Sequence, residues 1–167
     1  SIFASPESYP IMANEEVMNL LKKEPGLKHV QRISQKMGML KTNDAYQTIS
    51  LKGIADEYDT QFLQEHIVEG EIPAYAVDSS ANNKIVVSKQ QARDLHLKVG
   101  QKVYAYFFEE TIKPRRFEIA ALYETNMPQF DKHYVIADMN MVNRLNNWND
   151  DQCSQLEIFL DDFKQLD

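Results

Sequence analysis

Cysteine and long apolar runs are what this sequence most clearly lacks. Cys153 is the single cysteine among 167 residues, which excludes an intramolecular disulfide and any zinc site built from several thiolates. No apolar run reaches the roughly 18 residues that a membrane-spanning helix needs. Cys153 precedes the alternating segment Ser154–Leu160, and no histidine is near it in sequence. We therefore expect a buried thiol at the start of a strand rather than a catalytic nucleophile.

Positive charge is also scarce. The chain carries 18 Lys and Arg against 25 Asp and Glu, which gives a formal net charge of −7. Binding to nucleic acid or to an anionic membrane depends on clustered cations, so we expect neither as a partner. The short basic segment Lys113–Arg116 is expected to be a solvated flank of a strand. With 43% apolar and 26% charged residues, the composition is that of an ordinary globular protein.

Motifs of known catalytic or cofactor-binding types are absent from the sequence. It has no P-loop, dinucleotide fingerprint, zincin helix or nucleophile elbow. His66 and Glu69 are one helical turn apart, a spacing that can hold a metal ion, but a catalytic zinc site needs a third ligand. We expect no catalytic, metal-binding or cofactor-binding residues and no cofactor. The sequence favours a binding or coupling module over an enzyme.

The segment from residue 83 to residue 108 says most about architecture. It predicts a β-branched strand, a helix that opens with a capping box, a glycine turn and a second strand. The first strand is Ile85–Val87, and the helix is Lys89–Leu95, with Ser88 and Gln91 as its capping box. Gly100 lies in the turn, and the second strand is Val103–Phe108. This order of elements is typical of a small barrel-like β unit.

The rest of the chain alternates between helical and extended patterns. One predicted helix begins after Asn14 and has Val17, Leu20 and Leu21 on one face. Two others cover Thr60–His66 and Asp138–Asn147. The predicted strands are Leu27–Leu40, Ala45–Ile54, Arg116–Thr125, Tyr134–Ala137 and Gln155–Leu160, with loops over Pro73–Asn83 and Asn126–Lys132. Strands in mostly sequential antiparallel order predict an α+β fold.

The change in composition near Ile54 predicts two lobes. The first is an α/β lobe of residues 1–55 plus 150–167, and the second is a mostly β lobe of residues 56–149 inserted into it. Ser1–Ala4 has an extended pattern and Phe163–Asp167 has the pattern of a helix start. We therefore expect the chain to be a domain of a longer polypeptide.

The predicted loop Asn126–Lys132 contains two large apolar residues, Met127 and Phe130. Exposed apolar side chains in a connecting loop mark a contact surface, so both are candidates for contact with a partner. The alternative is that the loop folds back and buries them in the core.

Six segments in a fixed order carry a family resemblance. They are Gly53-Ile54, Glu57-Tyr58-Asp59, Val68-Glu69-Gly70-Glu71-Ile72-Pro73, Ile85-Val86-Val87-Ser88, Leu95-His96-Leu97-Lys98-Val99-Gly100-Gln101-Lys102-Val103, and Phe117–Tyr123. Their order and spacing resemble the extracytoplasmic core domain of MacB- and FtsX-like ABC-transporter permeases, including the lipoprotein-releasing type. That family has Leu-Gly-Leu where this chain has Leu95-His96-Leu97, so histidine replaces the glycine that ends the helix. The first 50 residues match less specifically.

The resemblance implies a permease with four membrane helices, in an inner membrane, with this domain on the periplasmic side between the first two helices. It implies a porter-like α/β subdomain, a sabre-like β subdomain inserted into it, and no enzymatic activity in the domain itself. The implied partners are a cytoplasmic ATPase, a second permease subunit, and an extracytoplasmic carrier, lipoprotein or other protein.

Two alternatives remain at the level of the sequence. A free-standing periplasmic binding protein or chaperone would have a similar composition. A double-psi-type barrel domain also contains turns of the Leu-x-Val-Gly-x-x-Val kind.

Overall fold

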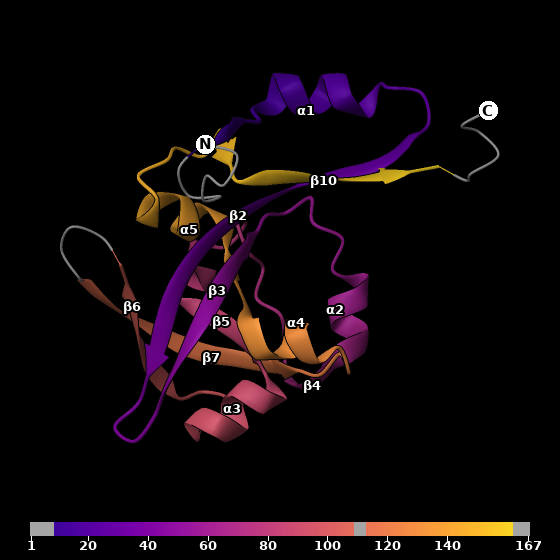
Figure 1. Cartoon of the computed structure of the whole chain (residues 1–167). Helices are drawn as coiled ribbons and strands as arrows, with labels where there is room; N and C mark the ends of the chain where they lie inside the picture. The colour runs from indigo at the N-terminus through magenta and orange to yellow at the C-terminus, as the bar shows by residue number, and fades with distance from the viewer. Residues whose placement is uncertain (1–8, 109–112, 162–167) are drawn as a thin grey trace.

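The computed structural model describes residues 9–108 and 113–161, and Figure 1 shows the arrangement of their elements. The segments Ser1–Ala4 and Phe163–Asp167 lie outside the described residues. The helices are α1 (Glu15–Lys22), α2 (Gln61–His66), α3 (Lys89–Leu95), α4 (Pro128–His133) and α5 (Met139–Leu145), with a 3₁₀ turn at Ser79–Ala81. The strands are β1 (Ile11–Met12), β2 (Leu27–Lys41), β3 (Tyr46–Ile54), β4 (Ile67–Gly70), β5 (Lys84–Ser88), β6 (Lys102–Phe107), β7 (Lys113–Tyr123), β8 (Tyr134–Asp138), β9 (Gln152–Cys153) and β10 (Gln155–Leu160).

One sheet dominates the described part of the chain. Its strand order is β10-β2-β3-β8-β5-β7-β4, and β6 pairs with both β2 and β7. Because β6 joins two strands that are not neighbours, the middle of the sheet closes into a barrel, while β10 extends from it along the first half of β2. The β3–β8 and β5–β7 pairs are parallel, and the other pairs are antiparallel. The predicted α+β class is confirmed.

The division into residues 1–55 plus 150–167 and residues 56–149 stays a prediction. Strands from both ranges are hydrogen-bonded in the same sheet, since β3 pairs with β8 and β2 pairs with β6. The long strand β2 runs from the layer of α1 and β10 into the barrel, as Figure 1 shows. The layer and the barrel are therefore connected by continuous backbone pairing.

Helix starts follow the predicted caps. The side chain of Asn14 accepts a hydrogen bond from Val17 N at 2.9 Å. Ser88 and Gln91 form the predicted capping box at the start of α3. Asp138 accepts from Met141 N at 3.1 Å at the start of α5. Each cap pairs a backbone N–H group that the first helical turn leaves without a partner.

The predicted loop Asn126–Lys132 is wrong in part, because α4 occupies residues 128–133. Pro128 lies at the first helical position, where its missing N–H and fixed φ suit a helix start. The strand β4 was not predicted, and it pairs with β7. Its pattern of one half-buried residue followed by three exposed ones has no alternation, so the sequence offers no strand signal there.

Apolar side chains form three buried clusters. The largest fills the barrel and includes Leu51, Val87, Ile119 and Val135. A second lies on the outer side of β3 and β8 under α2 and α4, and a third lies between α1 and β2. Gly53 lets α5 approach β3 closely, since a Cβ there would lie 2.9 Å from Met139 Cα.

Candidate functional site: the Lys52 cluster

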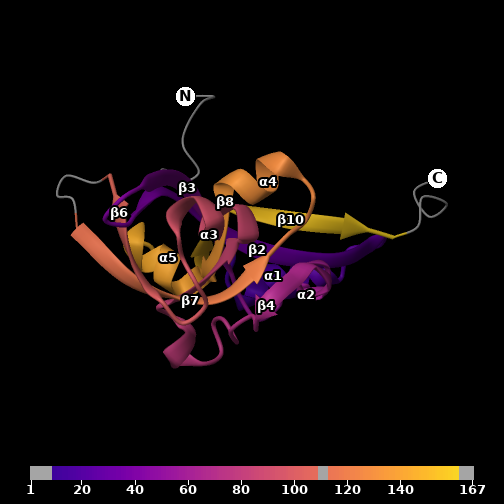
Figure 2. The same ribbon diagram turned by 90° about the horizontal axis from the view of Figure 1, so that it is seen from below.

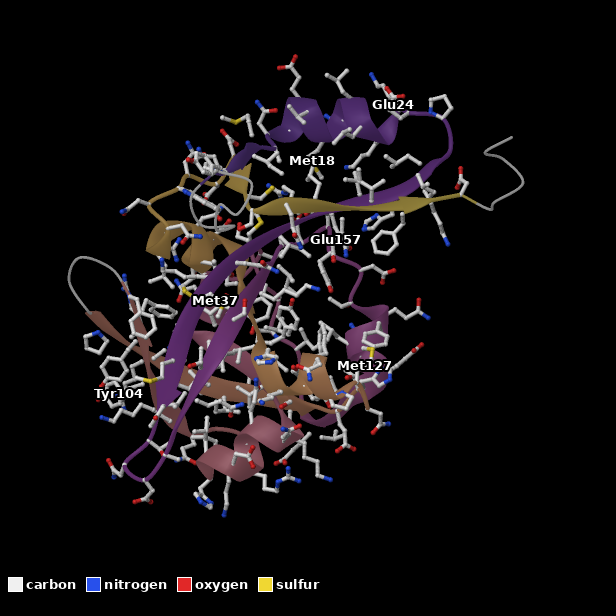
Figure 3. All side chains as sticks on the ribbon, in the orientation of Figure 1. Met18, Glu24, Met37, Tyr104, Met127 and Glu157 are labelled. Carbon is white, nitrogen blue, oxygen red and sulfur yellow. The ribbon has the colours of Figure 1, made fainter. Side chains whose placement is uncertain are left out.

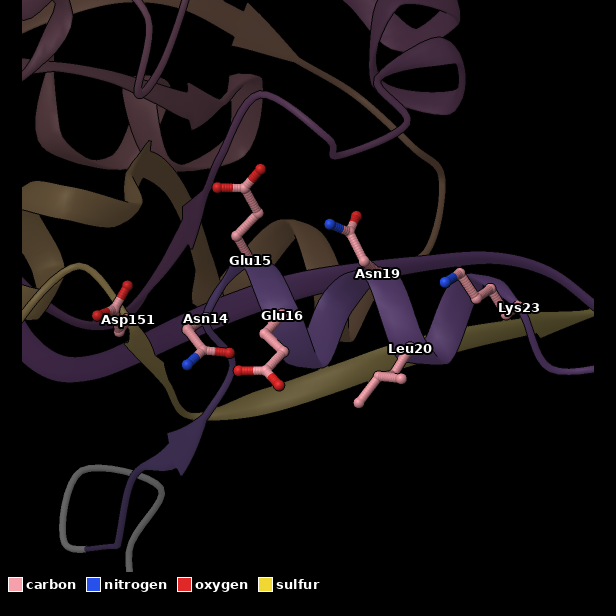
Figure 4. Close-up of a pocket in the computed structure, with 7 residues that line it drawn as sticks. All are labelled: Asn14, Glu15, Glu16, Asn19, Leu20, Lys23 and Asp151. Carbon is pink, nitrogen blue, oxygen red and sulfur yellow. The ribbon is translucent and has the colours of Figure 1, made fainter.

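The hollow beside the first helix is lined by ordinary surface side chains. The hollow along α1, shown in Figure 4, has Glu15 and Asn19 pointing to one side of the helix and Glu16 and Leu20 to the other. In residues 9–108 and 113–161, no group of three or more His, Cys, Asp or Glu side chains is placed to hold a metal ion. The candidate site is instead a set of polar and aromatic contacts that join β10 to β3 and to the segments next to it.

Lys52 lies on β3, between two buried residues, Leu51 and Gly53, that face the opposite side of the strand. Its ammonium Nζ is 5.5 Å from the ring centre of Tyr58, 5.7 Å from that of Phe130 and 5.9 Å from that of Tyr134. These distances are within the range of cation–π attraction. The Lys52 side chain is only 11% exposed.

Glu157, on β10, provides the carboxylate that faces Lys52. Its Oε2 lies 3.8 Å from Lys52 Nζ, and its Oε1 accepts a hydrogen bond from Gln31 Nε2 at 3.0 Å. Gln31 Oε1 in turn accepts from Asp59 N at 2.8 Å. Figure 3 shows Glu157 beneath β10, on the side away from α1. We call Gln31, Lys52, Tyr58, Phe130, Tyr134 and Glu157 the Lys52 cluster.

Burial shifts the ionisation of this cluster. It lowers the pKa of Lys52, and the charge and hydrogen bonding of Glu157 oppose that shift. It also raises the pKa of Tyr58 to about 12, with the charges of Glu157 and Asp59 acting in the same direction. Because aromatic rings enclose the ammonium group, the cluster connects β10 to β3, α4 and the segment after β3 rather than opening to a ligand.

A second polar contact joins β2 to the segment after β3. Arg32 Nη2 donates to Glu57 Oε1 at 2.7 Å, and Arg32 Nε and its backbone N donate to Oε2 at 3.2 and 2.8 Å. Burial raises the pKa of Glu57, but hydrogen bonds from Arg32 and its charge outweigh that effect and hold the pKa below its usual value. Arg32 Nη1 also donates to the Asp150 carbonyl at 3.4 Å. We call this contact and the Lys52 cluster together the β10 junction.

The two residues predicted to contact a partner lie in different surroundings. Met127 precedes α4 and is 44% exposed, and Figure 3 labels it at the surface of the domain. Phe130 is half-buried and packs against the rings of Tyr123 and Tyr134 at 5.7 and 4.9 Å between centroids. The structure places Phe130 inside the Lys52 cluster, and the partner-contact role of both residues stays a prediction.

The other residues considered in the sequence have ordinary structural surroundings. His66 is the last residue of α2, and its Nδ1 lies 2.7 Å from the Phe62 carbonyl oxygen. Cys153 is fully buried in β9, as expected, and burial raises the pKa of its thiol to about 11. A thiol with a raised pKa is a poor nucleophile at neutral pH.

Sequence reasoning did not identify Gln31, Lys52 and Glu157. Lys52 has one weak signal, because it is a charged residue between apolar ones in a strand that is buried on one face. Its partner Glu157 is more than 100 positions away in the sequence, and only the pairing of β10 with β2 brings the two together.

Sequence comparisons give no relatives. No known protein family has a profile that matches the chain, and no curated protein sequence matches it. Comparison with solved structures gives clear likenesses in fold. The extracellular domain of the noncanonic ABC-type transporter YknZ from Gram-positive bacteria is 19% identical with a TM-score of 0.64, over 99% of this chain and 80% of that one. The periplasmic region of MacB from Actinobacillus actinomycetemcomitans is 13% identical with a TM-score of 0.59, over 93% of this chain and 68% of that one.

The chain therefore has the fold of the extracytoplasmic domains of MacB-like ABC-transporter permeases. The fold expected from the sequence resemblance is confirmed. The helices of the described residues are all too short or too polar to cross a membrane.

Proposed function

We propose that this chain is the extracytoplasmic domain of an ABC-transporter permease, in a cell membrane, and that it converts cytoplasmic ATP hydrolysis into movement outside the membrane. The observation that carries the proposal is the likeness in fold to a transporter's extracellular domain over 99% of this chain. Its proposed partners are a cytoplasmic ATPase, a second permease subunit, and an extracytoplasmic carrier, lipoprotein or other protein. Export and lipoprotein release are both consistent with this role.

The path of the chain supports a mechanical role. β1 pairs with β9, and β9 leads into β10, so the described chain enters and leaves through the layer that contains α1 (Figure 1). A displacement applied at these two places reaches the barrel through the backbone of β2 and through the contacts of that layer. The β10 junction supplies such contacts, since Glu157 and Arg32 bind groups on or just after β3.

The domain is proposed to have no enzymatic activity of its own. The Lys52 ammonium group is enclosed by three rings, and the Cys153 thiol is buried with a raised pKa. Neither group has the access that a nucleophile needs. In the proposed role, chemistry belongs to the ATPase partner and this chain contributes shape and attachment. Met127 is proposed as part of a partner contact, since its large apolar side chain is 44% exposed.

Labelling in intact cells tests the proposed location. Tyr104, on the barrel surface, is 50% exposed, so the variant Tyr104→Cys presents a reactive thiol while Cys153 stays buried. In cells that express the gene-encoded polypeptide, we expect a membrane-impermeant maleimide to label this variant, and the labelled protein to sediment with membranes. Labelled protein released in soluble form by osmotic shock would contradict the permease and support a free-standing binding protein.

A further inference from the structure

A cavity lined in part by arginine residues lies beside the start of β7. Its volume is about 530 Å³, and it is bordered by the start of β7, the turn before β5 and α5. Three of its lining residues are Arg115 and Arg116 on β7 and Arg144 on α5. The turn adds the side-chain amides Asn82 and Asn83. We call this cavity the arginine pocket.

The cavity brings together Arg115 and Arg144. Arg115 shares a face of β7 with the buried Phe117, whereas Arg116 lies on the other face, opposite the exposed Tyr104. Within residues 9–108 and 113–161, neither Arg115 nor Arg144 forms an ion pair. The chain as a whole carries a net charge of −7. Two such cations lining one cavity of an acidic protein are an arrangement that an anionic ligand would stabilise.

The number and geometry of the donors favour phosphate over carboxylate. Each guanidinium presents five N–H donors in a planar fork, and this fork matches the oxygens of phosphate and carboxylate groups. A carboxylate has two oxygens to share among the forks of Arg115 and Arg144 and two amides. A terminal phosphate group has three oxygens and a charge of about −1.5 to −2 near neutral pH, so it can accept from more of them at once.

The pocket also has an apolar boundary. Phe117, Met141 and Leu145 line it, and all three belong to the barrel core. These buried side chains bound the cavity on the side of the barrel core. The basic segment Lys113–Arg116, expected from the sequence to be only a solvated strand flank, contributes Arg115 to the cavity on the face of β7 that Phe117 shares.

We propose that the arginine pocket binds a phosphate group, either of a small soluble molecule or of a lipid headgroup. This binding goes beyond the proposed coupling function and does not depend on it. Because the charge is local, we expect the interaction to weaken as salt concentration rises.

The test is a titration of the chain with inorganic phosphate, followed by the side-chain Nε–H signals of arginine in NMR spectra. We expect saturable shifts at Arg115 and Arg144, larger than any at Arg116, with a Kd of about 1 mM. The double variant Arg115→Gln/Arg144→Gln should weaken binding about tenfold or more. Arg93→Gln is the matched control, since Arg93 lies on α3, pairs with Asp94 and is 73% exposed in its side chain. Thermal unfolding of each variant checks that it is folded.

A parallel experiment distinguishes the two sources of phosphate. Sedimentation with phosphatidylglycerol vesicles, compared with phosphatidylcholine vesicles, tests for a lipid headgroup. Vesicle binding that the double variant loses and Arg93→Gln keeps would support a lipid ligand, and phosphate binding without vesicle binding would support a soluble one. The proposal is overturned if neither probe binds, or if the double variant binds as the wild type does.

Discussion

The barrel interior and the β10 junction are stabilised by different kinds of contact. The barrel is filled by apolar side chains, many of them fully buried, such as Leu51, Ile85 and Ile119. The junction depends on a few directional contacts, chiefly Arg32 with Glu57 and Lys52 with Glu157. Apolar packing is lost only when many atoms separate together. Polar contacts, in contrast, can be replaced one at a time by hydrogen bonds to water. We therefore expect single substitutions to have larger effects on global stability in the barrel than in the β10 junction.

The largest effect is expected in the barrel. Leu51→Ala removes a fully buried side chain from the main cluster, so we expect the free energy of unfolding to fall by about 3 kcal/mol. Chemical denaturation monitored by circular dichroism measures it. Tyr46→Ala on the same strand is the control, because Tyr46 is 72% exposed and its loss should change stability by less than about 1 kcal/mol. Equal effects of the two substitutions would contradict a barrel stabilised by apolar packing.

The next effect concerns Glu57. Glu57→Gln removes the charge from its contacts with Arg32, so we expect a loss of about 2 kcal/mol at neutral pH. The folded protein lowers the pKa of Glu57, so this stabilisation is complete above the ordinary carboxyl pKa and is lost as pH falls through the lowered value. The difference between wild type and variant should therefore shrink in acid. Asp56→Asn is the control, since Asp56 is 63% exposed and 3.9 Å from Arg32. A difference that persists unchanged in acid would exclude this ion pair as its source.

A smaller effect of opposite sign is expected at His96. This residue ends α3 with φ of 57° and ψ of 45°, a left-handed conformation that favours glycine. His96→Gly should raise the free energy of unfolding by about 0.5–1 kcal/mol. His96→Ala removes the same imidazole but keeps a Cβ, so it should give no such gain. If both variants are equally stable, the backbone conformation is not the cause.

The smallest effect on global stability, and the sharpest test of the comparison, is expected for Lys52. Lys52→Met keeps the length and apolar contacts of the side chain but removes the charge that faces Glu157. Because the Glu157 side chain is 32% exposed and keeps its hydrogen bond from Gln31, global stability should change by less than about 1 kcal/mol. Hydrogen exchange in β10 should nevertheless become faster, while exchange in β5 and β7 stays unchanged. Lys98→Met, on an exposed turn, is the control. Unchanged exchange in β10 would show that the Lys52 cluster does not fix this strand.

Local features of this fold were predictable and distant pairings were not. Asn14 and the Ser88–Gln91 box depend on neighbours three residues away, so the sequence shows them directly. The helix α4 was missed although Pro128 signals its start, because a six-residue helix offers no long periodic pattern. The strand order and the closure by β6 depend on non-local pairing that no local pattern specifies.

The candidate site was harder to predict than the fold. The Lys52 cluster gathers residues from β2, β3, the segment after β3, α4, β8 and β10. Its two charged members, Lys52 and Glu157, are far apart in the sequence. Each residue of the cluster therefore looks, in the sequence alone, like an ordinary polar or aromatic residue. Phe130 was selected because it is a large apolar residue in a predicted loop, and the structure shows that it covers Lys52 instead of lying in open solvent.

The central claim is that ATP hydrolysis moves this domain outside the membrane. The most direct measurement uses the gene-encoded polypeptide in lipid nanodiscs with its ATPase, labelled with a spin probe at Tyr104→Cys, a half-exposed position on the barrel. Pulsed electron resonance then gives the distance between the labels of the two permease subunits. We expect different distance distributions without nucleotide and with ATP trapped by vanadate. Identical distributions in a preparation that hydrolyses ATP would contradict it.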